Sequence, residues 1–566
     1  MVQLDFIVMV VFAFLIFAIG LAFTKMGSKN SQAFFEAGGA TPWWINGLSL
    51  FISYFSAGTF VVWGSIAYKF GIVANLIQLT MAISGLLIAI YVAKRWKRTG
   101  VKTAAEYIGR RFSLKTQQLY TYLVLIMSLF TTASVLYPVG KMVHVATPYS
   151  LNTCIIIIGL IIVLYTAAGG LWAVLVTDVV QFVILTASVL IVIPIAFDQI
   201  GGVTQFFDRA PKGFFKPFND DYTIGFMLAF IVYQTVYIGG NWSYVQRYTS
   251  VKDEKNATKV AYTFTILYFI SPVIWMIPPM IYRIINPDLG GFAPEGAYMM
   301  LCQKILPAGL IGLVLAGMIS ATSSKANTTI NLAATVFSTD LYRNLIRPTA
   351  SEKELILIAR LFTVLFGAGT VIVAIFIPYI GGIVDFVLSI ASIAGGALFA
   401  PIIWSLFSKR QTSSSVITTT LITLSVNLFL KIAAPMLFAL KLSRTYETVI
   451  GQLTPLLILF LFERYYASKG FISPRANVFE DVIQLDSIKQ DEAFYESDTQ
   501  NRFGIKVISL SMSFVGIGII VLGAVSDNSS KVVNIVGSII LLAAFLIWRA
   551  SNREKNTRQE SSFIEV

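Results

Sequence analysis

The run from Trp43 to Tyr68, WWINGLSLFISYFSAGTFVVWGSIAY, is long enough to cross a bilayer as a helix, yet its centre is polar. Between Ile52 and Thr59 it contains two serines, a tyrosine, a glycine and a threonine. Such residues at mid-membrane depth let the backbone leave helical geometry, and the carbonyls freed there must face a cavity or a ligand. Close helix packing through small residues would explain the same composition. The stretch therefore predicts either a broken transmembrane helix or a tight helix contact.

Similar apolar runs recur on both sides of this segment. Of the 566 residues, 56% are hydrophobic and only 13% are charged, which leaves too little polar surface to coat a water-soluble globule. We predict an all-α polytopic membrane protein with about fifteen transmembrane helices, each run matching the hydrocarbon thickness of a bilayer. The predicted spans are approximately 5–23, 43–68, 72–93, 117–142, 150–168, 171–196, 223–241, 258–282, 304–338, 354–379, 383–407, 412–433, 447–463, 504–525 and 531–548.

The charged and reactive side chains exclude several classes of function. The net charge is +13, but the lysines and arginines lie in short loops between apolar runs, so nucleic acid is not an expected partner. Cys154, Cys302 and the single histidine, His144, are too few for a disulfide framework or a metal site. We find no phosphate loop, nucleophile elbow or zinc spacing, so we do not expect an enzyme. A small-molecule solute and membrane lipid are the expected partners, and the sequence is compatible with a monomer.

Basic loop residues set the expected orientation. The stretches 94–115 and 247–259 and the Lys-Arg pair at 409–410 fall on one common side, which the positive-inside rule assigns to the cytoplasm. The first apolar run has Asp5 in place of a basic leader and no small-residue cleavage site, so we expect it to remain as a span. We predict a multi-pass protein of the plasma (inner) membrane, with its N-terminus outside and its C-terminus in the cytoplasm.

The order of the spans indicates two inverted five-helix repeats, because a second unit that follows an odd number of spans enters from the opposite side. The second repeat would also begin with a broken helix, at Gly239-Gly240-Asn241-Trp242-Ser243. The predicted organisation is an extra N-terminal helix and loop (1–40), the first repeat (41–200), the second repeat (201–410), two peripheral helices (411–465), a cytoplasmic loop (466–503), two C-terminal helices (504–550) and a cytoplasmic tail (551–566).

Three stretches carry a family resemblance. They are Gly169-Gly170-Leu171-Trp172-Ala173-Val174 with Thr177-Asp178-Val179-Val180-Gln181; Leu315 to Ser324 with Ala334-Thr335-Val336-Phe337-Ser338-Thr339-Asp340-Leu341-Tyr342; and Ser56-Ala57-x-x-Phe60 after Pro42-Trp43-Trp44. In order and spacing they resemble the fifth, eighth and first core helices of the sodium:solute symporter family, whose sodium/glucose-cotransporter-like members have an inverted-repeat core. The resemblance covers roughly residues 1 to 465.

The resemblance implies a central sodium site, and one of its positions departs from the family pattern. Carried over by position, the site would use the backbone carbonyls of Ile52, Phe55 and Ala321 and two hydroxyl positions that fall here on Ser324 and Lys325. An ammonium has three donors and no acceptor, so Lys325 cannot coordinate sodium. We hypothesise that the Lys325 ammonium occupies the central sodium position, paired to or near Asp178. Alternatively, Lys325 extends into an inner vestibule without a coupling role.

A second ion site is implied at Asp178, Asn327 and Thr328. Three coupling modes therefore stay open: sodium bound at this second site, a proton carried by Lys325, or uncoupled transport. Sodium as a coupling ion is the one metal that the resemblance implies, and we expect no other cofactor.

The substrate site is also implied by the resemblance. The sugar-binding positions of galactose-transporting members fall on Thr59, Gln78, Asn241, Tyr268 and Leu388, of which all but Leu388 can hydrogen-bond to hydroxyl groups. Interhelical hydrogen bonding would equally explain Gln78 and Asn241. Aromatic residues that could stack on a sugar ring or close a gate are Tyr54, Trp63, Tyr233, Tyr237, Trp242 and Tyr244.

The preferred solute is a neutral sugar or polyol, because no arginine is expected at the midplane. A cationic or amino-acid solute is second, with Asp385 as its evident carboxylate. The sequence thus predicts a secondary active transporter that moves a small polar solute by alternating access in cation-coupled symport. A sodium-independent carrier, with Lys325 replacing the central sodium, and a transporter-like solute sensor are the alternatives.

Overall fold

The structure is a computed structural model that describes residues 1–27, 41–101, 103–165, 171–476, 478, 490–526 and 529–564. Within its helices, some side chains lie outside the description, among them those of the predicted ion-site residues Ser324, Asn327 and Thr328. Throughout these ranges the chain forms helices and their connections, with one isolated extended bridge between Thr41 and Val251.

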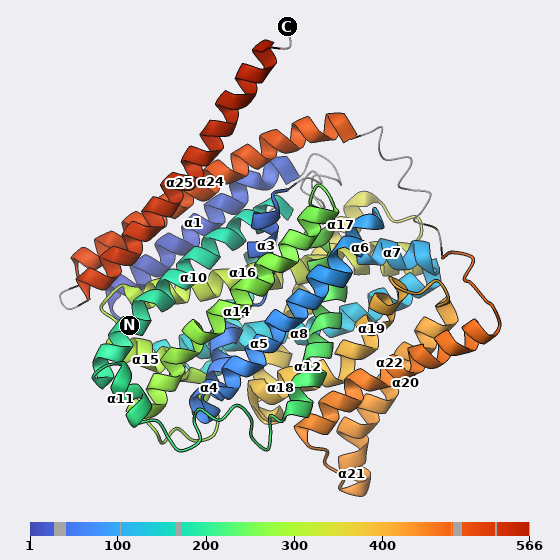
Figure 1. Ribbon diagram of the computed structural model, residues 1–566, viewed down its shortest axis with the longest axis horizontal. Coiled ribbons are helices and arrows are strands. Elements are labelled where there is room, and N and C mark those ends of the chain that lie inside the picture. The colour runs from blue at the N-terminus through green and yellow to red at the C-terminus, as the bar shows by residue number, and fades with distance from the viewer. Residues whose placement is uncertain are drawn as a thin grey trace.

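The helices follow one another along the whole described chain (Figure 1). The first part contains α1 (Gln3–Gly27), α3 (Trp43–Ile52), η1 (Thr59–Trp63), α4 (Gly64–Phe70), α5 (Val73–Leu87), η2 (Ile88–Val92), α6 (Ala93–Arg98), α7 (Ala104–Arg111), α8 (Leu114–Ala146), α9 (Leu151–Tyr165), α10 (Leu171–Ile200), α11 (Val203–Asp208), α12 (Ile224–Gly240), α13 (Trp242–Thr249) and α14 (Glu254–Ile285). The second part contains η3 (Ala293–Gly296), α15 (Ala297–Ile305), α16 (Leu310–Val336), η4 (Phe337–Ile346), α17 (Glu352–Phe376), η5 (Ile377–Ile380), α18 (Gly382–Ile390), η6 (Ala391–Gly395), α19 (Gly396–Ser405), α20 (Ser413–Leu428), η7 (Phe429–Ala433), α21 (Ala434–Phe438), α22 (Arg444–Ser468), α24 (Gln490–Ala524) and α25 (Ser530–Ile564).

In the described part of the chain, ten helices are long and apolar enough to span a membrane, and the bent pair α12–α13 makes an eleventh candidate. Shorter apolar helices lie at four more of the predicted spans, in α1, α3, α9 and α16. The helix α3 is short because the chain leaves helical geometry after Ile52. The predicted total of about fifteen spans and the inverted repeat remain predictions.

The first broken helix lies where the sequence places it, between α3 and η1. At the break, the hydroxyl of Thr59 donates to the carbonyl oxygen of Tyr54 (3.1 Å) and accepts from the backbone N–H of Ser56 (3.3 Å). One side chain thereby satisfies two backbone groups that a continuous helix would have paired. The polar centre of this segment thus interrupts the helix, which is the first of the two predicted alternatives.

The second break separates α12 from α13 at Asn241, with a bend of 63°. The Asn241 side chain caps α13 by accepting from the backbone N–H of Ser243 (3.1 Å). Just before the break, the backbone carbonyl of Gly239 accepts from the indole N–H of Trp96 (2.7 Å). A Cβ on Gly240 would lie 3.1 Å from the Cβ of Phe399, so this glycine lets α12 and α19 approach closely.

Helix α1 packs along α16 and α10, and a buried carboxylate of α1 joins it to the start of α16. The Asp5 carboxylate accepts from the backbone N–H groups of Gly309 (2.7 Å) and Gly312 (3.3 Å) at the start of α16. A Cβ on Gly312 would lie 2.0 Å from the carbonyl oxygen of Asp5, so this contact requires glycine. Asp5 therefore acts as an N-cap supplied by a neighbouring helix.

The helices that follow the two predicted repeats lie on opposite flanks of the bundle (Figure 1). The hairpin α24–α25 packs on α10, whereas α20 and α22 pack on α19. Two boundaries differ from the prediction, since α24 begins at Gln490 inside the predicted loop 466–503 and α25 continues to Ile564 through the predicted tail. The short helices α7, α11 and α15 lie in connections that the sequence did not predict to be helical.

Candidate functional site

Two adjoining cavities lie between the broken helices. We name them the Arg247 cavity, which has a volume of about 840 Å³ including its part open to solvent, and the Trp63 cavity, of about 790 Å³. They are neighbours because they share lining side chains from α8, α12, α13 and α16. The shared side chains are Thr131, Val135, Tyr237, Tyr244 and Lys325.

The Trp63 cavity is lined by aromatic rings and by neutral polar groups. The first broken helix contributes Tyr54, Thr59 and Trp63, and α12 contributes Tyr233 and Gln234. Of the described residues that line this cavity, Lys325 alone is charged. Hydroxyl, amide and aromatic groups in this combination suit a solute with hydroxyl groups and an apolar ring face.

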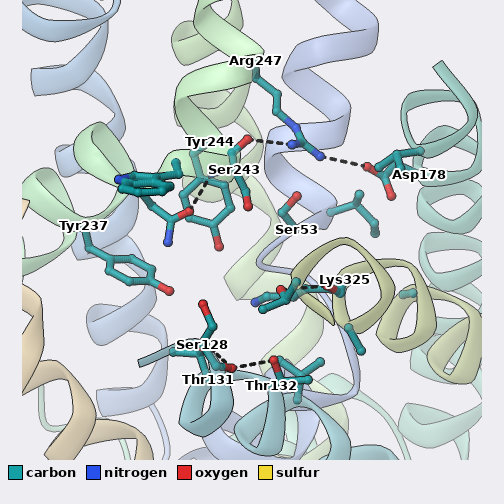
Figure 2. A pocket seen from close by; sticks show the side chains of 18 of the residues that line it. Ser53, Ser128, Thr131, Thr132, Asp178, Tyr237, Ser243, Tyr244, Arg247 and Lys325 are labelled. Carbon is teal, nitrogen blue, oxygen red and sulfur yellow. Dashed lines mark hydrogen bonds and ion pairs between the residues drawn. The ribbon is translucent and has the colours of Figure 1, made fainter. Parts of the chain in front are cut away.

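A buried ionic cluster lies at one side of the Arg247 cavity, as Figure 2 shows. The Arg247 guanidinium on α13 lies 3.7 Å from the Asp178 carboxylate on α10. The Ser49 hydroxyl on α3 donates to the same carboxylate oxygen (2.6 Å) and accepts from Arg247 Nε (3.2 Å). Arg247 also donates to the backbone carbonyl of Ser243 (2.6 Å). The cluster thus joins α10 to one half of each broken helix.

Lys325 lies on α16 and lines both cavities; Figure 2 shows it among the side chains of the Arg247 cavity. Its ammonium nitrogen lies 5.9 Å from the centroid of the Tyr54 ring, which is within cation–π range. Among the described residues, no carboxylate lies within ion-pair distance of the Lys325 ammonium. The salt bridge of Asp178 in this structure is to Arg247. The hypothesis placed Lys325 paired to or near Asp178; the two residues line the Arg247 cavity together, and the replacement of the central sodium by the lysine stays a prediction.

The structure separates the predicted substrate residues into two groups. Tyr54, Thr59 and Trp63 line the Trp63 cavity, and Asn241 lines the Arg247 cavity. Gln78 is completely buried and donates to Met276 Sδ (3.8 Å). Tyr268 packs in an aromatic cluster with Tyr54, Phe51 and Phe264. Neither residue lines the Arg247 cavity or the Trp63 cavity. The remaining transferred position, Leu388, is buried and likewise lines neither cavity.

Of the predicted ion-site residues, Ile52, Ala321 and Lys325 line the Arg247 cavity together. Phe55 is fully buried and its ring stacks on Trp275. The side chains of Ser324, Asn327 and Thr328 lie outside the described part of the structure, so the second ion site stays a prediction. Asp385, the carboxylate considered for a cationic solute, pairs instead with Arg444 (2.5 Å) away from both cavities.

Two sets of cavity residues were missed from the sequence. The first is Arg247, which the sequence places in a basic stretch, whereas the structure buries it against Asp178 at the wall of a cavity; the expectation that no arginine lies at the membrane midplane stays a prediction. The second set is a row of hydroxyls on α8, namely Ser128, Thr131 and Ser134. Their spacing of three residues on one helix face was a signal that could have identified them.

Comparisons with known proteins agree with this architecture. The family model described as sodium:solute symporter family matches residues 34–423. Sodium/glucose cotransporter 1 of Mus musculus is 28% identical over 462 residues, which cover 72% of this chain and 68% of that protein. Sodium/myo-inositol cotransporter 2 of Homo sapiens is 28% identical over 407 residues, which cover 64% of this chain and 59% of that protein.

A solved structure of a Na⁺-coupled sialic acid symporter, substrate-bound and outward-open, has a TM-score of 0.67 at 20% identity and covers 82% of this chain and 98% of that one. At this identity the likeness shows the fold. The family resemblance inferred from the three sequence stretches is confirmed by the family model, which spans well over half of the chain. The chain is a multi-pass membrane protein that belongs to the sodium:solute symporter family.

Proposed function

We propose that the chain is a secondary active transporter that carries a small polar solute, a sugar or polyol, across the plasma membrane by alternating access. The observation that supports this most strongly is the pair of adjoining cavities between two broken helices, lined by hydroxyl, amide and aromatic groups. Alternating access requires a central site that can open to either side, and inverted-repeat carriers build it at such breaks. The names of the sugar and inositol cotransporter relatives favour the same solute class.

Within this proposal, the five-helix units 41–200 and 201–410 form the inverted repeat, the N-terminus lies outside and the C-terminus lies in the cytoplasm. Tyr54, Thr59, Trp63 and Asn241 are the sequence-derived substrate residues that retain direct support, because they line a cavity. Gln78 and Tyr268 would reach the solute only if the helices moved.

For coupling, we propose that the Lys325 ammonium stands in for the central sodium. Lys325 lines one cavity together with Ile52 and Ala321, which are two of the positions that the family resemblance assigns to that sodium site. A lysine inside a span costs about 2.5–3.5 kcal/mol on insertion scales, so its position calls for a role. Sodium at the second site, formed by Asp178, Asn327 and Thr328, is the alternative that retains sodium coupling.

Uptake in proteoliposomes tests the function and its coupling. A labelled panel of sugars and polyols is offered with and without a sodium gradient, crossed with a pH gradient. We expect movement of solute, and we expect Lys325→Ser to make uptake more dependent on sodium by freeing the central position. Lys304→Ser, at an exposed lysine on α15, is the matched control.

Two results would contradict the proposal. A solute that binds without ever being moved would identify a sensor, and unchanged sodium dependence in Lys325→Ser would remove the replacement role of the lysine.

A further inference from the structure

The charges around the cavities are not balanced. The described residues lining the two cavities include three ionic side chains, and two of them, Arg247 and Asp178, pair with each other. The third is Lys325, the one ionic side chain in the sequence of α16, with no carboxylate of the described chain within ion-pair distance. Because a half-buried ammonium inside a membrane span is costly without a counter-charge, the balance calls for an anionic partner.

Three hydroxyls that line the Trp63 cavity do not offer their protons to an anionic partner, because these protons are already donated. The hydroxyls of Thr131, Ser134 and Thr59 donate to the backbone carbonyls of Ser128 (3.2 Å), Thr131 (2.8 Å) and Tyr54 (3.1 Å). Their oxygens remain as acceptors. They therefore suit the O–H donors of a solute and disfavour a carboxylate beside them.

Two further polar atoms at the Trp63 cavity have no partner within the described structure. Gln234 is only 3% exposed, and its carbonyl oxygen Oε1 accepts no hydrogen bond. The Tyr54 hydroxyl is likewise buried without a partner, close to the lysine that faces its ring. Both atoms are covered in this structure, so a side-chain rotation toward the cavity would let Gln234 Oε1 accept from a solute hydroxyl and the Tyr54 hydroxyl donate to an anionic group.

We propose that the transported solute is a polyhydroxylated carboxylate, such as a sugar acid. Its carboxylate binds the Lys325 ammonium and its hydroxyls donate to the acceptor row of Thr59, Thr131, Ser134 and Gln234. This inference rests on the proposed transporter function and refines its solute class. It also accounts for the lysine, since the positive charge that replaces the central sodium becomes the anion-binding group. A cationic solute would be repelled, and an amino acid would find no described carboxylate at the Trp63 cavity for its ammonium.

Counterflow in proteoliposomes with two matched pairs of labelled compounds tests this inference. The pairs are glucuronate with glucose and gluconate with glucitol, and each pair differs by a carboxylate in place of one CH₂OH group. We expect each acid to exchange about tenfold or more faster than its neutral partner at low concentration, the factor expected for one charge-assisted hydrogen bond.

The variants separate anion binding from a general effect on folding. Lys325→Met should slow exchange of the acids by about 10- to 100-fold more than exchange of the neutral compounds and so remove the preference for acids, whereas Lys325→Arg should keep that preference. Lys304→Met is the matched control and should behave as wild type. The comparison within the wild-type protein needs no variant to fold.

Neutral compounds that exchange as fast as the acids in wild type, or an equal loss for both in Lys325→Met, would overturn the inference while leaving the transporter proposal intact. A well-folded wild-type protein that exchanges none of the four compounds would refute both.

Discussion

The buried ion pair between Arg247 and Asp178 makes a quantitative prediction about stability. Both side chains are almost completely buried, with the nearest nitrogen and oxygen 3.7 Å apart. At an effective dielectric constant of about 20, the attraction at this distance is about 4.5 kcal/mol, and removing one member of a buried pair costs about 3–5 kcal/mol. Arg247→Met keeps an apolar stem but removes the cation that faces Asp178. We expect its apparent unfolding temperature to fall by roughly 2–4 °C, because the unfolding entropy of a chain of 566 residues is large and spreads the same free energy over fewer degrees.

The measurement is thermal unfolding of detergent-purified protein, followed by the loss of the monodisperse peak in size-exclusion chromatography. Adding Asp178→Asn to Arg247→Met neutralises the remaining charge, so the double variant should recover much of the loss. Lys304→Met serves as the control for replacing a cation elsewhere. The reasoning is wrong if Arg247→Met unfolds within about 1 °C of wild type, or if the double variant loses as much as the two single variants together.

Two further predictions concern the ends of the bundle. Asp5→Ala removes the acceptor for the backbone N–H of Gly309 and should lower the free energy of unfolding by about 0.5–2 kcal/mol. Asp5→Asn keeps an acceptor and should lose less. Equal unfolding temperatures for wild type and Asp5→Ala would contradict this prediction. Burial raises the pKa of the Glu295 carboxyl above its ordinary value, although Tyr137 donates to it (2.6 Å) and partly offsets the shift. The folded state then holds its proton more tightly than the unfolded state, so stability should fall as the pH rises from the ordinary carboxyl range through the raised pKa. Glu295→Gln should flatten that part of the pH–stability curve, and an unchanged slope would exclude Glu295 as its cause.

Local composition predicted the helices and both breaks. The run 72–93 becomes a span from Val73 to Arg98, because apolar residues continue for a full membrane thickness. The polar centre at 52–59 and the Gly-Gly-Asn sequence at 239–241 both mark the positions where helices stop. Each of these features depends on residues that are close in sequence.

The ionic arrangement depends on residues far apart in sequence, and here the sequence was insufficient. Arg247 follows a broken helix and has the composition of a basic loop, so the positive-inside rule placed it in solvent. Its burial depends on Asp178 from α10 and Ser49 from α3. The sequence identified Lys325 and Asp178 as unusual charges but could not decide which cation faces the carboxylate, because that choice depends on side-chain positions across three helices.

The central claim is that the space between the two broken helices is a solute pathway, and a cysteine at Thr131 tests it most directly. Thr131 lines both cavities, and the native cysteines, Cys154 and Cys302, are buried. In sealed proteoliposomes of known orientation, we expect Thr131→Cys to react with a membrane-impermeant thiol reagent added from either side, and the reaction to stop solute exchange. Failure to react from both sides, or full exchange after complete labelling, would contradict the account.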